Sequence, residues 1–235
     1  MKRIVCFLLL CISLGAFAQQ DITSLKTKAE QGNAEAQFTL GILYWRGGNG
    51  IKQNQPEACN WFQKSAEQGN PKAQRYLGIC YEFGHGVEKN EAKAKELYAR
   101  AFPNLKSVAE LGDSEAQFAL AEHYYFGDAV QENSTEAVKW YRKAAEQGHA
   151  GALYNLGTFY ENGEGVPQSY TEAVKWYRKA AEQGLASAQY NLGSYYFNGL
   201  GVQKNRAMGI FWYKKAAKQG DRDAKSQLNE MGIDY

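Results

Sequence analysis

Three histidines, at His85, His123 and His149, are the side chains best suited to acid–base or metal chemistry near neutral pH. None of them stands in a His-Glu-x-x-His pair or at another spacing typical of metal ligands. The sequence also contains no Gly-x-Ser-x-Gly, Ser-x-x-Lys or Gly-x-x-x-x-Gly-Lys motif, the signatures of common hydrolases and phosphate-binding enzymes. We therefore expect no catalytic residue, no metal site and no cofactor.

Two of the four cysteines, Cys59 and Cys80, lie in the body of the chain and could do thiol chemistry. No histidine is placed in the sequence to activate either thiol as a nucleophile. The two cysteines fall in the second helix of one predicted unit and the first helix of the next, which are neighbours in a stack. A disulfide between them is possible if their Cα atoms come within about 7 Å. Two separate buried thiols are the alternative.

An internal repeat positions these residues. A Glu-Gln-Gly segment or a variant of it closes each unit with a glycine, at positions 32, 69, 112, 148, 184 and 220. The spacings are 37, 43, 36, 36 and 36 residues, and the segment from Thr135 to Gly148 recurs unchanged from Thr171 to Gly184. Self-similarity at such a period is typical of arrays in which each unit stacks on its neighbours.

One unit, residues 148–183, has the pattern of two helices joined by a turn. Small and apolar residues recur at helical spacing from Ala150 to Tyr160, and Gly163-Glu164-Gly165-Val166 then interrupts the helix. A second apolar face follows from Ala173 through Trp176 and Ala180. A single helix pair cannot bury this face alone, so the pattern predicts an all-α solenoid of helix-turn-helix units.

The repeat divides the chain into segments with distinct expected roles. We expect a signal peptide over residues 1–18, a capping helix over 19–31, five repeats over 32–68, 69–111, 112–147, 148–183 and 184–219, and a second capping helix over 220–235. The repeat over 69–111 carries an insertion near residues 102–108 that contains Pro103. Because proline removes a helical hydrogen-bond donor, we expect a break or kink there that divides the array into 19–111 and 112–235. A solvent loop with no role is the alternative.

The N-terminus has the form of an export signal. A basic start, Met1-Lys2-Arg3, precedes an apolar run from Ile4 to Leu14, and Ala16-Phe17-Ala18 fits the rule for signal peptidase. Removing residues 1–18 leaves 25 basic and 25 acidic side chains, counted from 27 and 25 in the whole chain. We expect a periplasmic or secreted protein with no membrane-spanning segment in the mature chain and no nucleic-acid partner.

The repeat resembles the Sel-one-like repeat (SLR) family, which is related to tetratricopeptide repeats. The resemblance covers residues 24–232. One copy of the first-helix motif reads Ala186-Ser187-Ala188-Gln189, Leu192-Gly193, Tyr196 and Gly199-Leu200-Gly201-Val202. One copy of the second-helix motif reads Ala173, Trp176-Tyr177 and Lys179-Ala180-Ala181-Glu182-Gln183-Gly184. The resemblance implies a right-handed α/α superhelix in which the first helices line the concave face.

Candidate ligand contacts lie in columns of the first helix that the packing stripe does not use. Aromatic rings beside side-chain amides suit an extended peptide or a sugar polymer. The candidates are Phe38, Arg75, Tyr76, Phe118, His123, Tyr154, Asn155, Tyr190, Asn191 and Tyr195. Packing of these aromatics against the next repeat is the alternative.

The resemblance favours one function over two others. We expect a non-catalytic scaffold that binds a protein or an extended peptide, because SLR relatives commonly act as adaptors. Some secreted cysteine-rich SLR proteins are described as β-lactam-binding or β-lactam-hydrolysing, and this chain could be such an enzyme. Those relatives carry a cysteine pair in most repeats, whereas this chain has one candidate pair. A binder of envelope glycans is the third hypothesis.

Overall fold

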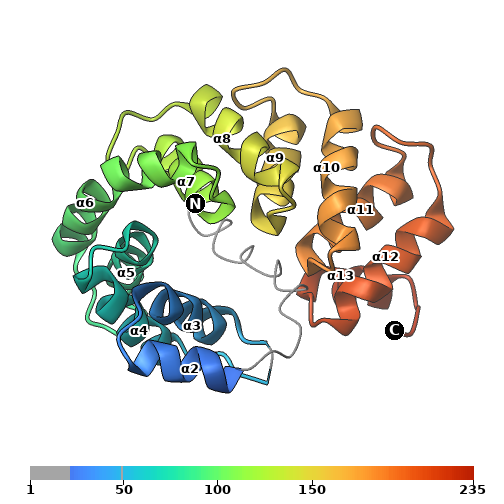
Figure 1. Ribbon diagram of the computed structural model, residues 1–235. Helices are drawn as coiled ribbons and strands as arrows, with labels where there is room; N and C mark the ends of the chain where they lie inside the picture. The colour runs from blue at the N-terminus through green and yellow to red at the C-terminus, as the bar shows by residue number, and fades with distance from the viewer. Residues whose placement is uncertain (1–21, 49) are drawn as a thin grey trace. The chain divides into compact units, whose positions relative to one another are not determined.

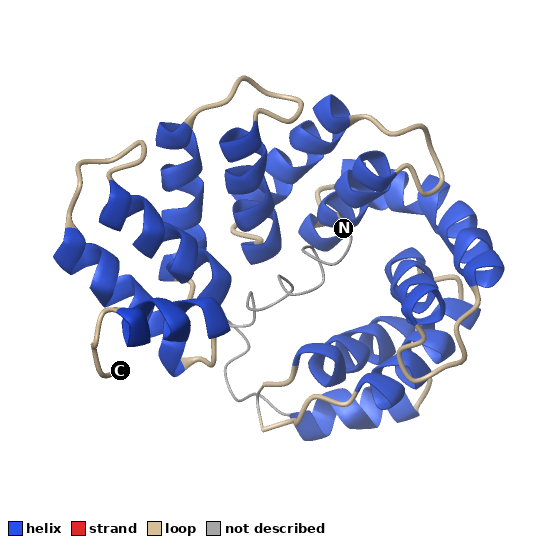
Figure 2. Cartoon of the chain, turned by 180° about the vertical axis from the view of Figure 1, so that it is seen from behind, coloured by secondary structure: helices blue, strands red, loops and turns tan. Residues whose placement is uncertain are grey.

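The structure is a computed structural model that describes residues 22–48 and 50–235, and these residues form helices, turns and no strand (Figures 1 and 2). The predicted signal peptide over residues 1–18 lies outside the described residues. The helices in chain order are α2 (Ile22–Glu30), α3 (Ala34–Arg46), α4 (Gln55–Glu67), α5 (Pro71–Phe83), α6 (Glu91–Glu110), α7 (Ser114–Phe126), α8 (Ser134–Glu146), α9 (Ala150–Asn162), α10 (Tyr170–Glu182), α11 (Ala186–Asn198), α12 (Arg206–Lys218) and α13 (Arg222–Glu230). This is the predicted all-α solenoid, in which each helix packs on the next from α2 to α7 and again from α8 to α13.

The described residues form two compact units. The N-terminal unit runs to Asn133 and contains α2 to α7, and the C-terminal unit, Ser134–Tyr235, contains α8 to α13. Each unit has a short helix at one end. In the N-terminal unit Ala29 of α2 packs with Leu40 and Trp61, and in the C-terminal unit α13 packs against Tyr213. No helix among the described residues is long and apolar enough to cross a membrane.

A polar side chain before α5 and a glycine after it mark the two ends of this helix. Asn70 stands before α5, and its side-chain oxygen accepts a hydrogen bond from the amide of Ala73 at 3.0 Å. This satisfies one of the backbone donors that a helix N-terminus leaves without a partner. At the other end, Gly84 has a φ of 72° in the left-handed region, where a side chain would be strained. Cap and turn together fix where α5 starts and stops.

A glycine in the first helix lets an aromatic ring of the second helix pack against the backbone. In α9, a Cβ at Gly157 would lie 2.7 Å from two ring carbons of Tyr177, which is fully buried. The same arrangement holds in four of the five helix-pair repeats. The pairs are Gly41 with Phe62, Gly78 with Tyr98, Gly157 with Tyr177 and Gly193 with Tyr213. This close approach explains why a glycine stands in the middle of these helices despite its low helix propensity.

Glutamine side chains link most first helices to the helix before them. Gln37 donates to the carbonyl oxygen of Ala29 at 3.0 Å, eight residues earlier in the preceding helix. The same bond recurs at Gln74, Gln117 and Gln189. The glutamine of the Glu-Gln-Gly signature then adds a second link, as when Gln68 donates to Gln37 at 2.7 Å. The glutamine of the Glu-Gln-Gly motif therefore stabilises the stacking of one repeat on the next.

Helix α6 has no break at Pro103, so this part of the prediction is wrong, whereas a kink there stays a prediction. Helix α6 runs without interruption from Glu91 to Glu110, and the inserted residues lengthen it. Pro103 and Ala99, whose carbonyl loses its helical donor, both lie on the exposed side, where water can satisfy that oxygen. The opposite side of the added turns buries Leu105 and Ala109. The predicted division at residue 111 is also wrong, since the boundary between the compact units lies between Asn133 and Ser134.

Candidate functional site

The structure places the ten predicted contact residues on the first helices and buries most of them. Tyr190 and Asn191 of α11 are partly exposed. The buried members are Phe38, Arg75, Tyr76, Phe118, His123, Tyr154, Asn155 and Tyr195. They are buried because α3, α5, α9 and α11 each pack on the helix before and the helix after, and α7 packs on α6 and α5. Whether any of the ten contacts a ligand stays a prediction.

Aromatic rings fill the space between α3, α4 and α5. The ring of Phe62 stacks on that of Tyr76 with centroids 4.9 Å apart, and Phe38 and Trp45 flank the pair at 5.7–6.3 Å. Such centroid distances are typical of stabilising ring pairs in protein cores. The rings of Phe38 and Tyr76 therefore contribute to packing between repeats.

A charged row crosses three first helices of the N-terminal unit. The ammonium of Lys72 on α5 lies 2.8 Å from Glu35 Oε1 at the start of α3 and 3.0 Å from Asp113 Oδ2 beside α7. Burial alone lowers the pKa of Lys72, but its bonds to the two carboxylates outweigh burial and raise the pKa above its ordinary value. The buried lysine thus holds two partly or fully exposed carboxylates in fixed positions.

A second polar group lies one turn further along the same helices. The hydroxyl of Tyr76 donates to Glu115 Oε1 at 2.8 Å and accepts from Arg46 at 3.3 Å. Burial, followed by the charge of Glu115, raises the pKa of Tyr76 well above its ordinary value. The phenol therefore stays protonated and acts as a donor between α5 and α7.

A buried ion pair joins Arg75 of α5 to Glu122 of α7, and both side chains are about 95% buried. Burial raises the pKa of the Glu122 carboxyl to about 7, although the Arg75 guanidinium acts in the opposite direction. The ring of His123 lies edge-on to Tyr98 at 5.6 Å and to Phe102 at 5.8 Å. Arg75 and His123 are thus fixed in the interior of the N-terminal unit.

Tyrosines gather around one carboxylate in the C-terminal unit. The hydroxyl of Tyr177 on α10 donates to Glu161 Oε2 on α9 at 2.5 Å. The rings of Tyr154 and Tyr195 lie 5.3 Å and 5.6 Å from that of Tyr177. We call Glu161, Tyr154, Tyr177 and Tyr195 the tyrosine cluster. Asn191 reaches its edge by donating to the Tyr154 hydroxyl at 3.3 Å.

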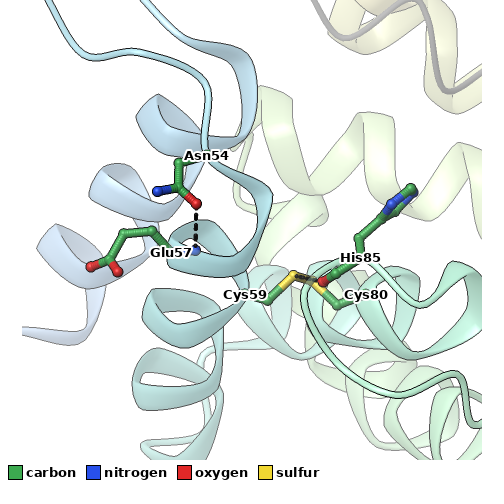
Figure 3. Close-up of a disulfide and its surroundings, with 5 residues drawn as sticks. All are labelled: Asn54, Glu57, Cys59, Cys80 and His85. Atoms are coloured by element: carbon green, nitrogen blue, oxygen red, sulfur yellow. Dashed lines mark hydrogen bonds between the residues drawn. A yellow bond between two sulfur atoms is a disulfide. The ribbon is translucent and has the colours of Figure 1, made fainter.

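The structure joins Cys59 of α4 and Cys80 of α5 in a disulfide with a Cα–Cα distance of 6.1 Å (Figure 3). Both cysteines are buried. The carbonyl oxygen of His85 lies 2.7 Å from Cys59 Sγ. A disulfide sulfur carries no proton, so this is a close contact, whereas a free Cys59 thiol could donate to that oxygen. The bond ties the second helix of one repeat to the first helix of the next.

The three histidines have separate structural settings. His85 packs edge-on to Trp45 at 5.4 Å, and burial lowers its pKa. His149 stands before α9, where its Nδ1 accepts from the amide of Ala152 at 3.1 Å. The part of the chain that the structure describes holds no group of three or more side chains able to bind a metal ion.

Sequence reasoning missed the charged partners that organise these sites. Glu122 occupies a first-helix position where two other repeats have Ile42 and Ile79, and Glu161 occupies the position of Trp45. For Glu122 the available signal was a charge at a position that is apolar in two sister repeats, whereas the position of Glu161 also carries Glu82 in another repeat. The other missed residues are Glu35, Arg46, Lys72, Asp113 and Glu115.

Comparison with known proteins agrees with this architecture. The Sel1 repeat model matches five segments, residues 34–70, 71–102, 114–149, 150–185 and 186–221. None of the curated proteins is a match for the chain.

Three solved structures are similar to the chain over most of its length. A protective antigen with an SLR fold from uropathogenic Escherichia coli is 38% identical with a TM-score of 0.58, over 89% of this chain but 44% of its own. A Sel1 repeat protein from Oxalobacter formigenes is 36% identical with a TM-score of 0.59, over 88% of this chain and 79% of its own. A Sel1 repeat protein from Klebsiella pneumoniae is 20% identical with a TM-score of 0.54, over 89% of this chain and 98% of its own, and shows likeness of fold alone.

Proposed function

Because the chain belongs to the Sel1 repeat family, we propose that it is an exported, non-catalytic scaffold that binds a protein or an extended peptide through the first helices of its repeats. Members of this family are generally scaffolds without catalytic activity. A solenoid repeats the same surface at each unit, which suits a partner that is extended along the array.

The observation that carries the proposal is the row formed by Glu35, Lys72 and Asp113. It spans the first helices of three successive repeats, and the buried ammonium of Lys72 fixes the carboxylates at both of its ends. Side chains held in place before binding lose little conformational entropy when a partner arrives. The row therefore offers a partner an ordered pattern of hydrogen-bond acceptors.

Crosslinking in the exported fraction tests the proposal when it is combined with residue-level mapping of the crosslinks. We expect crosslinks to one defined partner at first-helix positions, and we expect E35Q/D113N to lose that partner. Asparagine at 113 can still cap α7, and both new amides keep an oxygen that can accept from Lys72. Because the variant leaves the buried ammonium without a carboxylate, thermal unfolding must show that it is folded before its crosslinks are compared. The matched control is E30Q/E110Q, which removes two exposed charges at the ends of α2 and α6. Crosslinks confined to second helices, or full capture by E35Q/D113N, would contradict the proposal.

Export is supported by two features of the chain. The N-terminal sequence has the form of a cleavable signal, and the Cys59–Cys80 disulfide is of a kind that persists in oxidising compartments. N-terminal sequencing of the mature protein should begin at Gln19. A mature chain that still begins at Met1 would refute the export proposal and leave the binding proposal standing.

A further inference from the structure

Glu161 is an enclosed carboxylate that lacks a cation. Its side chain is partly buried beside Tyr177 and accepts that residue's hydroxyl proton in a hydrogen bond. No lysine, arginine or histidine among residues 22–48 and 50–235 forms an ion pair with it. A partly buried carboxylate without a counter-ion loses hydration that the two neighbouring phenols, Tyr177 and Tyr195, only partly replace. The position is therefore complementary to a positively charged group from outside.

The N-terminal unit has an equivalent carboxylate–tyrosine pair, with an arginine at a neighbouring repeat position. Glu82 occupies the repeat position of Glu161, and Tyr98, at the position of Tyr177, donates to Glu82 at 2.7 Å. There the position of Tyr154 is taken by Arg75, whose buried guanidinium pairs with Glu122. The C-terminal unit has the same carboxylate–tyrosine pair, but no internal guanidinium beside it.

The three rings of the tyrosine cluster are buried, and a more exposed ring lies at the edge of the cluster. Tyr170, which is 40% exposed, adds a fourth ring edge-on to Tyr195 at 6.1 Å. Aromatic faces attract ammonium and guanidinium groups, most strongly where water is excluded. The hydroxyl of Tyr195 is buried, and burial, followed by the charge of Glu161 and a side-chain hydrogen bond to it, raises the pKa of Tyr195 well above its ordinary value. The oxygen of this phenol can also accept a hydrogen bond from a bound donor.

We propose that the tyrosine cluster, with Tyr170 at its edge, binds a lysine or arginine side chain of the partner polypeptide. This inference rests on the proposed function, because it names the chemistry of the partner where the first helices α9 and α11 meet the second helix α10. A metal ion is a poor occupant, since Glu161 is one carboxylate and hard cations take six or more oxygen ligands. Exposed apolar surface on Tyr170 and on Leu200, in the adjoining turn, suits residues that flank the basic side chain.

Oriented peptide pools test the inference on the full mature chain. Nonapeptides of random sequence with a fixed central lysine, arginine, glutamine or Nε-acetyl-lysine are immobilised, and binding of the labelled protein is measured. We expect about tenfold stronger binding to the lysine and arginine pools than to the glutamine and acetyl-lysine pools, which corresponds to one charge-assisted contact. This comparison uses the unaltered protein and does not depend on any variant folding.

Two variants and one control assign the effect to the cluster. E161Q keeps an oxygen that can accept from Tyr177 but removes the charge, and should bind all pools equally. Y195F should weaken binding to the basic pools several-fold. E182Q removes an exposed charge at the end of α10 and should behave as the wild type. Equal binding of all pools by the wild type overturns the inference but leaves peptide binding intact. Binding of no pool above background refutes peptide binding itself.

Discussion

Reducing the Cys59–Cys80 disulfide should destabilise the N-terminal unit without unfolding the C-terminal unit. The bond links α4 to α5, and each unit has its own core. In repeat proteins stability is close to a sum of repeat and nearest-neighbour contributions, so the loss should be concentrated around the first two repeats. Double substitution C59V/C80L removes the bond with residues that the chain already uses at these positions, Val in two repeats and Leu in one.

The size of the effect follows from the separation of the two cysteines. They are 21 residues apart, and closing a loop of that length in the unfolded chain corresponds to about 3 kcal/mol in the chain-entropy description. With a urea dependence of about 1.5 kcal/mol per molar for a unit of this size, the unfolding midpoint should fall by about 2 M. The Cys59 thiol released by reduction can donate to the His85 carbonyl, which offsets a small part of the loss.

Urea unfolding with and without a thiol reductant measures this difference, and hydrogen exchange locates it. We expect reduced wild type and C59V/C80L to unfold at similar urea concentrations, and we expect reductant to have no effect on the double variant. Faster exchange should appear in α4 and α5 and should leave α10 and α11 unchanged. Identical midpoints for oxidised and reduced wild type would refute the reasoning, because the disulfide would then contribute nothing to the stacking of the first two repeats.

Three further predictions concern packing, charge and capping. Gly157→Ala should lower stability by about 1–3 kcal/mol in thermal unfolding, because the new Cβ meets the buried ring of Tyr177, and an unchanged or raised melting temperature would contradict the packing. The folded-state pKa of Glu122 is about 7 against an ordinary 4.5, so its stabilising contribution is complete below pH 4.5 and is lost as pH rises through 7. The stability difference between the wild type and E122Q should therefore fall by up to about 3 kcal/mol between about pH 4 and pH 8, and a difference independent of pH would show that Arg75 keeps Glu122 ionised throughout. Asn90→Ala should cost about 1 kcal/mol in urea unfolding through loss of the cap on α6, whereas Asn90→Ser should cost little.

Helix positions were predictable because each depends on residues close in sequence. The glycine after a first helix, the asparagine or aspartate before the next, and the small residues at helical spacing all act within a few residues. The insertion in α6 was harder, because proline is unfavourable only where its neighbours need the lost hydrogen bond. Pro103 and Ala99 face water, and the helix continues. Which side of a helix faces water is set by the stacking of units, which local sequence does not encode.

The candidate site was less predictable for the same reason. Residues outside the packing stripe of one helix pair were expected to be accessible to solvent. Stacking of the preceding repeat nevertheless buries Tyr76 and Tyr154. Arg75 finds its partner Glu122 47 residues further along the chain. Only an alignment of the repeats with one another places these two side chains in adjacent helices. Pairings of this kind depend on the repeat length and on the insertion in α6 together.

Departures from the repeat carry the specificity that a scaffold needs. Residues that are the same in most repeats serve helix packing. The glycines contact aromatic rings, and the glutamines donate hydrogen bonds to the preceding helix. A partner can therefore distinguish one repeat from another only at positions where their residues differ. At one such place the N-terminal unit has Arg75 and Glu122, and the C-terminal unit has Tyr154 and Ser194. The first combination neutralises itself in the interior, and the second leaves Glu161 without an internal cation. Two units of the same fold thus present different chemistry from equivalent positions.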